Sequence, residues 1–334
     1  MKPAKQNKQC SHKRDAILKV LLENFGHFVP GEILTRASNL SRSGVWKYIT
    51  SLRSQGFSIG ASIKRGYCLR EIPDKLLPPL IQTGLQTSVV AREIHYFSTI
   101  DSTNRVAKEY ALSGVSDGAV VIAEEQTSGK GRMNRVWVSP PSSNILCSLI
   151  FYTSMNTSSV FRLTMLASIA VVRAINNACG IVAQIKWPND VYINGKKVCG
   201  ILTEFLADHD STSYVVIGIG INVNFDIARH PEIKGIATCL KEAKGQKVSR
   251  LRVLKALLEE IDTLYQNFVQ TGGEDLRKQW ERHSMVLNRQ ATIISGDEVT
   301  RGFVKGINED GHLILIDPQG NTKEVLCGDL SFKF

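Results

Sequence analysis

The chain has 334 residues, of which 43% are hydrophobic, and this size predicts two or three globular domains. No apolar run approaches the roughly 18 residues of a membrane span, and the first residues lead into no apolar segment of the kind found in secretory signals. We therefore expect a soluble, cytoplasmic protein. The seven cysteines include no CxxC pair, which favours reduced, mostly buried thiols over disulfides or a zinc site.

The positive charge is concentrated near the N-terminus. Residues 1–70 hold thirteen Lys/Arg and three Asp/Glu, a surplus of ten, which equals the surplus of the whole chain (41 minus 31). A basic module on an otherwise neutral chain predicts contact with a polyanion, most simply DNA. A basic solubilising tail is the alternative, but it accounts only for the cations of residues 1–14.

The segment after residue 14 has the pattern of a winged helix-turn-helix. Its first predicted helix ends at Gly26 and has one apolar stripe, formed by Ile17, Leu18, Leu21, Leu22 and Phe25. A second short helix fits residues 32–37, and Ser41 can cap a third. The helix-turn-helix spans about Pro30 to Ile49, and residues 59–69 predict a two-stranded wing.

The third helix has a surface suited to the major groove of DNA. Val45, Ile49 and Leu52 face inward, whereas the outward positions carry cations and short hydroxyls. The predicted DNA-contacting residues of this helix and the wing are Arg42, Ser43, Lys47, Thr50, Arg53, Lys64 and Arg65. A winged helix that docks proteins is the alternative interpretation.

After a linker marked by Pro73, Pro78 and Pro79, the chain predicts an α+β domain. Strands are expected at residues 95–97, 119–123, 144–152, 198–205 and 214–224. One helix is expected to be capped by residues 101–104 and to run to about residue 112, and a second to span 160–179 and end at Gly180. We expect a mixed sheet with helices on one face. Gly218 and Gly220 lie inside a strand and open no helix, which argues against a Rossmann fingerprint.

Three segments of this domain predict a pocket for an anionic ligand. Lys186-Trp187-Pro188-Asn189-Asp190 follows an apolar strand and precedes the hairpin signal Asn194-Gly195 and the pair Lys196-Lys197. Residues 129–137 form a second cationic loop. Residues 218–222 form a strand whose glycines let a ligand approach the backbone closely.

On these residues the chain resembles the bifunctional bacterial biotin protein ligases that also act as biotin operon repressors. The matching motifs, spread over essentially the whole chain, are Asp-Ser-Thr-Asn at 101–104, Gln126, Lys-Trp-Pro-Asn-Asp at 186–190, Lys197 and the glycine-bearing strand at 218–222. The resemblance implies a winged helix over 1–74, a biotin/lipoate-ligase-like catalytic domain over 75–283, and a small SH3-like β-barrel over 284–334.

The resemblance also implies a two-step reaction. Biotin and ATP give biotinyl-5'-AMP and pyrophosphate with the help of Mg²⁺, and a lysine of the biotin carboxyl carrier protein of acetyl-CoA carboxylase then takes the biotin. Biotinyl-5'-AMP is expected to act as corepressor, favouring a homodimer that binds the operator DNA of biotin genes. Both partners in the first step are anions, so the chemistry needs fixed cations.

Site residues follow from the same resemblance. It implies that Arg132, Lys186 and Lys197 are catalytic, that Asp190 holds Mg²⁺, and that the ureido ring of biotin is hydrogen-bonded by Ser102, Thr103 and Gln126. The implied biotin and adenylate site comprises Ser102, Thr103, Asn104, Gln126, Lys130, Gly131, Arg132, Trp137, Asn189, Lys197, Gly200, Gly218, Gly220 and Asn222. For Ser102, the alternative role is that of a helix cap.

The chain departs from the family's pattern at a few positions. Lys130, Met133 and Asn134 stand where the family has Arg, Arg and Gly, and Asn134 is expected to tolerate left-handed backbone. Ile236 stands about where the known repressors carry a Trp over the adenine. We expect these changes to affect retention of the intermediate and the coupling of ligand to dimer formation more than activity.

Two other functions remain open: a lipoate or octanoyl ligase of the same superfamily, and a ligand-sensing transcription factor with a decayed catalytic domain. The Lys-Trp-Pro-Asn-Asp segment and the fused winged helix disfavour the first. The presence of Arg132, Lys186 and Asp190 disfavours the second.

Overall fold

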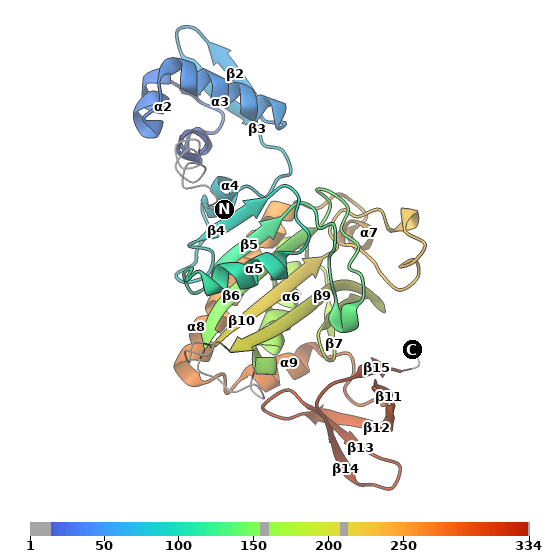
Figure 1. Cartoon of the computed structure of the whole chain (residues 1–334). Helices are drawn as coiled ribbons and strands as arrows, with labels where there is room; N and C mark the ends of the chain where they lie inside the picture. Colours follow the sequence, from blue (N-terminus) through green and yellow to red (C-terminus); the bar gives the residue numbers. More distant parts are fainter. Residues whose placement is uncertain (1–14, 154–159, 208–212, 333–334) are drawn as a thin grey trace. The chain divides into compact units, whose positions relative to one another are not determined.

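The computed structural model describes residues 15–153, 160–207 and 213–332, and the chain divides into two compact units, Met1–Leu85 and Gln86–Phe334 (Figure 1). The three domain ranges expected from the sequence divide the chain more finely and stay predictions. Residues 1–14, which carry the cations of the alternative basic tail, lie outside the described residues. No helix in the described part of the chain is long and apolar enough to cross a membrane.

The first unit is a winged helix, as predicted. A helix over residues 15–23 is followed by β1 (Phe28–Val29), α2 (Gly31–Ser38), α3 (Arg42–Ser54), β2 (Ser58–Ser62) and β3 (Gly66–Glu71), and the sheet order is β1-β3-β2. The Ser41 hydroxyl accepts a hydrogen bond from the Gly44 amide at 3.2 Å, which caps α3. Val45, Ile49 and Leu52 are buried, so the predicted inner face of α3 is confirmed.

Two local predictions in this unit were wrong. Phe25 is 48% exposed and Leu22 is half-buried, because the first helix ends at residue 23 and Phe25 lies in the turn beyond it. The expected linker contains a short helix, α4 (Pro78–Gln82), which starts with its two prolines. Proline favours the first turn of a helix, since its fixed φ suits that position and its missing N–H would be unpaired there anyway.

The second unit is built on a seven-stranded mixed sheet. The sheet order is β4-β5-β6-β10-β9-β8-β7, with β4 (Ile94–Phe97), β5 (Ala119–Ala123), β6 (Ile145–Thr153), β7 (Gln184–Lys186), β8 (Asp190–Ile193), β9 (Lys196–Ala207) and β10 (Ser213–Ile221). Only the β4–β5 pair is parallel among the described strands. Asn194 and Gly195 both have positive φ between β8 and β9, so the predicted hairpin is confirmed.

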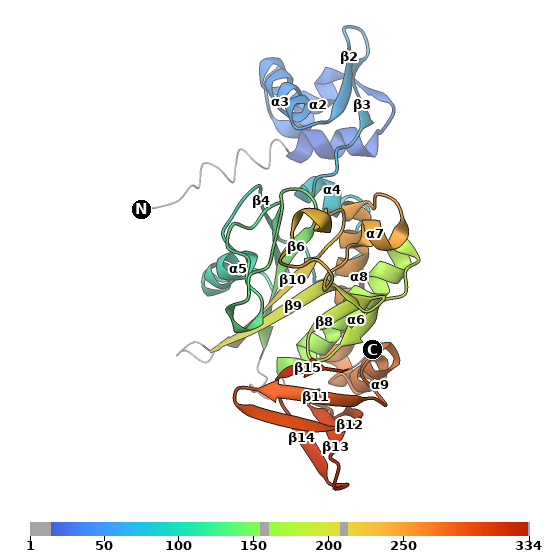
Figure 2. The ribbon, with the colours of Figure 1, turned by 90° about the vertical axis from the view of Figure 1, so that its right-hand side faces the viewer.

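Helices cover both faces of this sheet, which corrects the expectation of one covered face (Figure 2). Consecutive residues of β9 contact opposite layers: the hydroxyls of Thr203 and Thr164 on α6 (Phe161–Cys179) lie 2.7 Å apart, whereas Glu204 pairs with Lys108 on α5 (Thr103–Leu112). The long helix α8 (Arg250–Thr271) packs on α6. Neighbouring side chains of a strand point to opposite faces, so α5 and α6 lie on different sides.

The chain ends in an antiparallel five-stranded sheet, which bears out the predicted small β domain. Its order is β14-β13-β12-β11-β15, with β11 (Gln290–Ser295), β12 (Glu298–Ile307), β13 (Leu313–Ile316), β14 (Thr322–Val325) and β15 (Asp329–Ser331); α7 (Leu240–Lys244) and α9 (Leu276–His283) precede it. The buried Trp187 donates from Nε1 to the Gly311 carbonyl at 3.0 Å. The Lys-Trp-Pro-Asn-Asp segment is therefore tied to this sheet.

Candidate active site

A cavity of about 390 Å³ lies beside the N-terminus of α5. Every predicted biotin, adenylate and metal residue lines it, namely Ser102, Thr103, Asn104, Gln126, Lys130, Gly131, Arg132, Trp137, Lys186, Asn189, Asp190, Lys197, Gly200, Gly218, Gly220 and Asn222. These residues come from four strands (β7, β8, β9 and β10), from the start of α5 and from the loops between them.

Glycines form the part of the cavity wall beneath the Trp137 indole. Gly200 on β9 and Gly220 on β10 lie directly opposite each other in the sheet. A Cβ atom would come within 3.0 Å of Trp137 Cζ3 at Gly200 and within 2.6 Å of Trp137 Cε2 at Gly220. Only glycine lets the ring approach this closely, because any side chain would overlap it.

Another part of the lining is polar and uncharged, and two of its residues are hydrogen-bonded to each other. The Gln126 side-chain oxygen accepts hydrogen bonds from the Thr103 amide at 2.7 Å and the Thr103 hydroxyl at 2.9 Å. Ser102 precedes α5, but its hydroxyl makes no cap hydrogen bond, so its alternative role as a side-chain cap is wrong. Its side chain is therefore available to the cavity.

Asn104 also lines the cavity, but its side chain is engaged with the scaffold. Its amide nitrogen donates to the Leu202 carbonyl at 3.1 Å and to Glu204 at 2.8 Å, and its oxygen accepts from the Ser148 hydroxyl at 2.6 Å. A Cβ at Gly218 would come within 2.1 Å of that oxygen. Asn104 thus holds α5 against the glycine-bearing strand.

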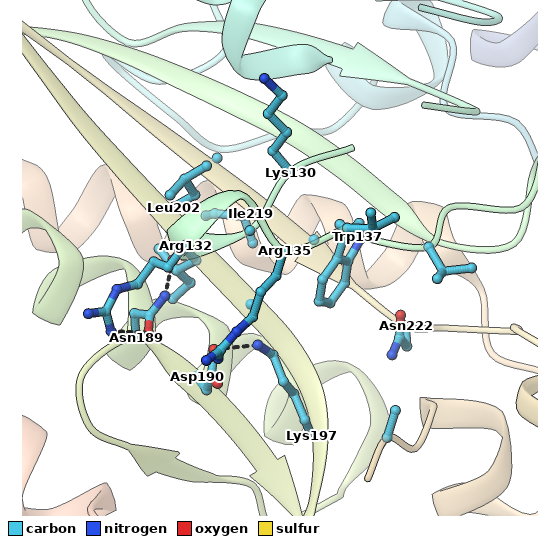
Figure 3. Close-up of a pocket in the computed structure, with 18 of the residues that line it drawn as sticks. Lys130, Arg132, Arg135, Trp137, Asn189, Asp190, Lys197, Leu202, Ile219 and Asn222 are labelled. Atoms are coloured by element: carbon cyan, nitrogen blue, oxygen red, sulfur yellow. Dashed lines mark hydrogen bonds and ion pairs between the residues drawn. The ribbon is translucent and has the colours of Figure 1, made fainter. Parts of the chain in front are cut away.

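The cationic end contains two contacts that the sequence did not predict (Figure 3). Lys197 Nζ lies 2.7 Å from Asp190 Oδ1, so the expected carboxylate-binding lysine and the expected metal ligand form an ion pair. Arg132 donates from Nη1 to Asn189 Oδ1 at 3.3 Å, and Asn189 Nδ2 donates to the Ile201 carbonyl. These contacts fix the two cations on one side of the cavity.

Lys186 is half-buried, like Lys197. Its Nζ donates to the Tyr192 hydroxyl at 3.4 Å. Burial lowers the pKa of Lys186, and the nearby Asp190 carboxylate partly opposes that effect. Burial also raises the pKa of Tyr192 to about 12, so this hydroxyl keeps its proton at neutral pH. The ammonium therefore lies in a partly desolvated setting, where its interaction with an anion is stronger than in water.

The loop before Trp137 differs from expectation at one backbone position. Met133, which is 69% exposed, has φ 54° and ψ 35°, so the left-handed conformation falls on it and not on Asn134. The Gly131 amide donates to the Arg135 carbonyl at 2.7 Å, which closes the turn around Met133. Lys130 points away from the cluster formed by Arg132, Asp190 and Lys197 (Figure 3).

Sequence reasoning missed two contributors from the C-terminal sheet. Asp329 and Leu330 of β15 line the cavity, and Asp329 forms an ion pair with Arg135 of the loop. Both residues come from the far end of the chain, and no local pattern marks them. Ile236, which the sequence did single out, lines the cavity and is 65% exposed.

A buried ion pair supports the site from behind. Arg250, at the start of α8, is fully buried and donates from Nη1 to Glu124 at 2.7 Å and to the Asn144 carbonyl at 3.1 Å. Asn144 in turn donates from Nδ2 to Asn222 Oδ1 at 3.4 Å. Two buried charges are tolerated because they are paired and hydrogen-bonded. This chain of contacts holds Asn222 in the cavity wall.

The cavity offers a divalent cation few ligands from the protein itself. Among the residues that the structure describes, no cluster of three or more His, Cys, Asp or Glu could hold a metal alone. Mg²⁺ commonly binds through one or two carboxylates together with substrate phosphates. Asp190, as a cavity carboxylate with a 22% exposed side chain, fits that mode of binding.

The predicted DNA-contacting residues are all exposed on the first unit. Arg53, however, donates from Nε and Nη2 to the Ile59 carbonyl at 2.9 and 2.6 Å, which joins α3 to the wing strand β2. Arg65 lies over the Phe28 ring at 4.1 Å. Part of the cationic surface is thus held in place by contacts within the module.

Comparisons with known proteins agree with this architecture. A model of the biotin/lipoate A/B protein ligase family matches residues 96–222, and a helix-turn-helix domain model matches residues 13–68. The bifunctional ligase/repressor BirA of Bacillus subtilis is 36% identical over 95% of this chain and 99% of its own length. The corresponding protein of Escherichia coli is 28% identical over 95% of this chain and 96% of its own length.

Among solved structures, the biotin protein ligase of Aquifex aeolicus in complex with biotin and ATP has a TM-score of 0.62 and 30% identity, covering 72% of this chain and 98% of that one. The fold is thus that of a ligase that attaches biotin to protein. With its helix-turn-helix unit, the chain belongs to the family of bifunctional biotin protein ligases and biotin operon repressors. The lipoate-enzyme alternative is therefore rejected.

Proposed function

We propose that this protein forms biotinyl-5'-AMP from biotin and ATP and transfers the biotin to a lysine of a biotin carboxyl carrier protein. The observation that carries the proposal is the convergence of Arg132, Lys186 and Lys197 on one cavity that is also lined by polar, uncharged residues. Such a cavity suits a ligand with a ureido ring at one end and a carboxylate at the other. We propose residues 75–283 as the ligase domain and 284–334 as the small β domain.

In the first step a biotin carboxylate oxygen attacks the α-phosphorus of ATP, and the bond from that phosphorus to pyrophosphate breaks. We assign Lys197 and Arg132 to the carboxylate and the adenylate, and Lys186 to the α-phosphate. Fixed cations lower the barrier because they offset charge on the attacking and leaving oxygens without reorganising. The partly desolvated position of Lys186 supports its role.

In the second step a neutral lysine amine of the acceptor attacks the biotinyl carbonyl carbon, AMP leaves, and the amine nitrogen loses a proton. The Trp137 indole and the loop of residues 129–137 would cover the anhydride and exclude water from it. Thr103, Gln126 and Ser102 would hydrogen-bond the ureido ring. Ser102 and Thr103 are buried and Gln126 is half-buried, which favours this role, since a buried polar ring needs donors and acceptors.

Asp190 is the residue that would hold Mg²⁺ delivered with the nucleotide, and the ion would then neutralise phosphate charge. For this, Lys197 must leave Asp190 and turn to the anionic ligand. In the 2.7 Å ion pair, the lysine for the anionic ligand and the carboxylate for the metal already lie next to each other.

The winged helix is proposed to bind the operator of biotin genes, with biotinyl-5'-AMP as corepressor favouring a homodimer that can span two half-sites. The basic surplus of residues 1–70 and the exposed cations of α3 and the wing support DNA binding. A protein that uses ATP and binds chromosomal DNA is expected in the cytoplasm.

One assay tests the catalytic proposal. The purified protein is incubated with biotin, MgATP and a carboxyl carrier domain, and pyrophosphate release and acceptor biotinylation are measured. We expect both, with pyrophosphate release dependent on biotin. If the protein is folded by circular dichroism but gives neither product, the result favours a ligand-sensing transcription factor with a decayed catalytic domain.

A further inference from the structure

Trp46 is a large aromatic side chain on the surface of α3. It is 56% exposed, although a tryptophan gains much by burial. It lies one helical turn after Arg42 and one turn before Thr50, so it belongs to the same outward stripe as the predicted DNA contacts. The sequence pattern of cations and hydroxyls did not include it.

The polar residues around Trp46 are largely engaged within the module. The Thr50 hydroxyl donates to the Trp46 carbonyl at 3.0 Å, and the Ser43 and Ser41 hydroxyls lie 2.9 Å apart. Arg53 is bound to the Ile59 carbonyl. Among the described residues, the side chains of Trp46 and Lys47 make no hydrogen bond or ion pair, so the middle of the stripe is free to contact a partner.

The charge around Trp46 indicates what that partner is. Residues 15–70 hold eight Lys/Arg and three Asp/Glu, and the Arg42 side chain is 85% exposed. A cationic surface with an apolar centre matches the major groove of duplex DNA, where phosphates flank the base edges. The apolar group presented there is the 5-methyl of thymine, which apolar side chains contact.

We propose that Trp46 is a specificity-determining residue that reads the 5-methyl group of a thymine in each operator half-site. The inference rests on the proposed operator binding and adds the chemistry of one base contact to it. Lys47, next to Trp46, supplies a phosphate or base contact of the ordinary cationic kind.

The test starts from a pool of random 40-base-pair duplexes, selected with the full-length protein in the presence of biotin and MgATP. The wild-type protein should enrich a motif with an invariant thymine. The Trp46→Ala variant should lose the preference at that position and keep the others. Phe25→Ala, which removes another half-exposed aromatic of the same unit, should select the wild-type motif.

A second measurement changes only the DNA. Replacing that thymine by deoxyuridine removes one methyl group and should weaken wild-type binding roughly fourfold, the value for one buried methyl. The same replacement should leave Trp46→Ala unaffected, while Trp46→Phe, which keeps an aromatic ring, should still discriminate. The comparison of the two duplexes with the wild-type protein and Trp46→Phe does not depend on how the alanine variant folds.

The outcomes separate the two proposals. If the wild-type protein enriches no sequence, operator binding itself fails. If it enriches a motif but binds the deoxyuridine duplex as tightly, or if Trp46→Ala selects the same motif with the same affinity, Trp46 does not read thymine. A second protein that binds the wild-type chain but not Trp46→Ala, with unchanged DNA selection by the variant, overturns the inference equally.

Discussion

Gly220→Ala should displace the Trp137 indole and weaken biotin binding. The added Cβ would lie 2.6, 2.7 and 2.8 Å from Cε2, Nε1 and Cζ2 of that ring, whereas ordinary contact begins at 3.4 Å. The ring must therefore withdraw by about 0.8 Å (3.4 minus 2.6). Overpacking of this kind costs about 1 to 3 kcal/mol, which corresponds to roughly 5-fold to 150-fold in affinity if the whole cost falls on the bound state.

Isothermal titration with biotin measures the effect, and Gly200→Ala provides a graded comparison. Its Cβ would lie 3.0 Å from the ring, an overlap of about 0.4 Å, so its loss should be smaller. Gly31→Ala is the matched control, because nothing lies within 4 Å of its Cβ. Wild-type affinity in Gly220→Ala, or a larger loss in Gly200→Ala, would refute the steric reasoning.

Three further outcomes test the assignments. Lys197→Ala should lower biotin-dependent pyrophosphate release by about 10²-fold. Lys196 lies outside the cavity, so Lys196→Ala should not lower it. Equal rates in the two variants would contradict the role of Lys197. Arg132→Gly should release biotinyl-5'-AMP, because the loop no longer shields the anhydride. The released intermediate should biotinylate bystander protein, which a streptavidin blot detects. An inactive variant without such leakage would assign Arg132 to the chemical step. Deleting residues 1–85 should abolish DNA binding in a mobility shift and preserve ligation, since the cavity lies wholly in the second unit. In the intact protein, affinity should fall by roughly 0.9 log units per log unit of salt for each phosphate contacted.

The boundary of that deletion has a structural reason. Asp262 on α8 accepts hydrogen bonds from the amides of Ser88, Val89 and Val90 at 2.8 to 3.0 Å, and backbone hydrogen bonds help to keep the pKa of its carboxyl below the usual value despite burial. The segment that enters the second unit is thus anchored within that unit. Removing only residues before it leaves these contacts intact.

Local physics made much of the fold predictable. The inner face of α3 follows from a 3.6-residue period, and the β8–β9 hairpin follows from Asn194 and Gly195, which tolerate positive φ. The charged and glycine-bearing segments at 129–137, 186–197 and 218–222 indicated a pocket for an anion, and the resemblance to the ligase family then named the individual cavity residues. Each of these signals lies within a few neighbouring residues.

What the sequence did not reveal depends on contacts between distant segments. The side of the sheet that α5 covers is decided by its packing, since its amphipathic pattern fits either face. Asp329 reaches the cavity from 194 residues beyond Arg135. Arg250 looks like a surface charge at a helix start, yet it is fully buried against Glu124, 126 residues away.

The least predictable feature was how the cavity compensates its own charges. Lys197 lies against Asp190, Arg132 against Asn189 and Arg135 against Asp329. Arg135 is exposed, but Arg132 and Lys197 are half-buried, and a half-buried cation without a partner costs free energy, which Asn189 and Asp190 offset. The partners of these cations also have to give way to the ligand. Asp329, the neutral amide of Asn189 and the expected metal ligand Asp190 can do so more easily than a fully buried ion pair. Arg250 and Glu124 form a pair of that buried kind.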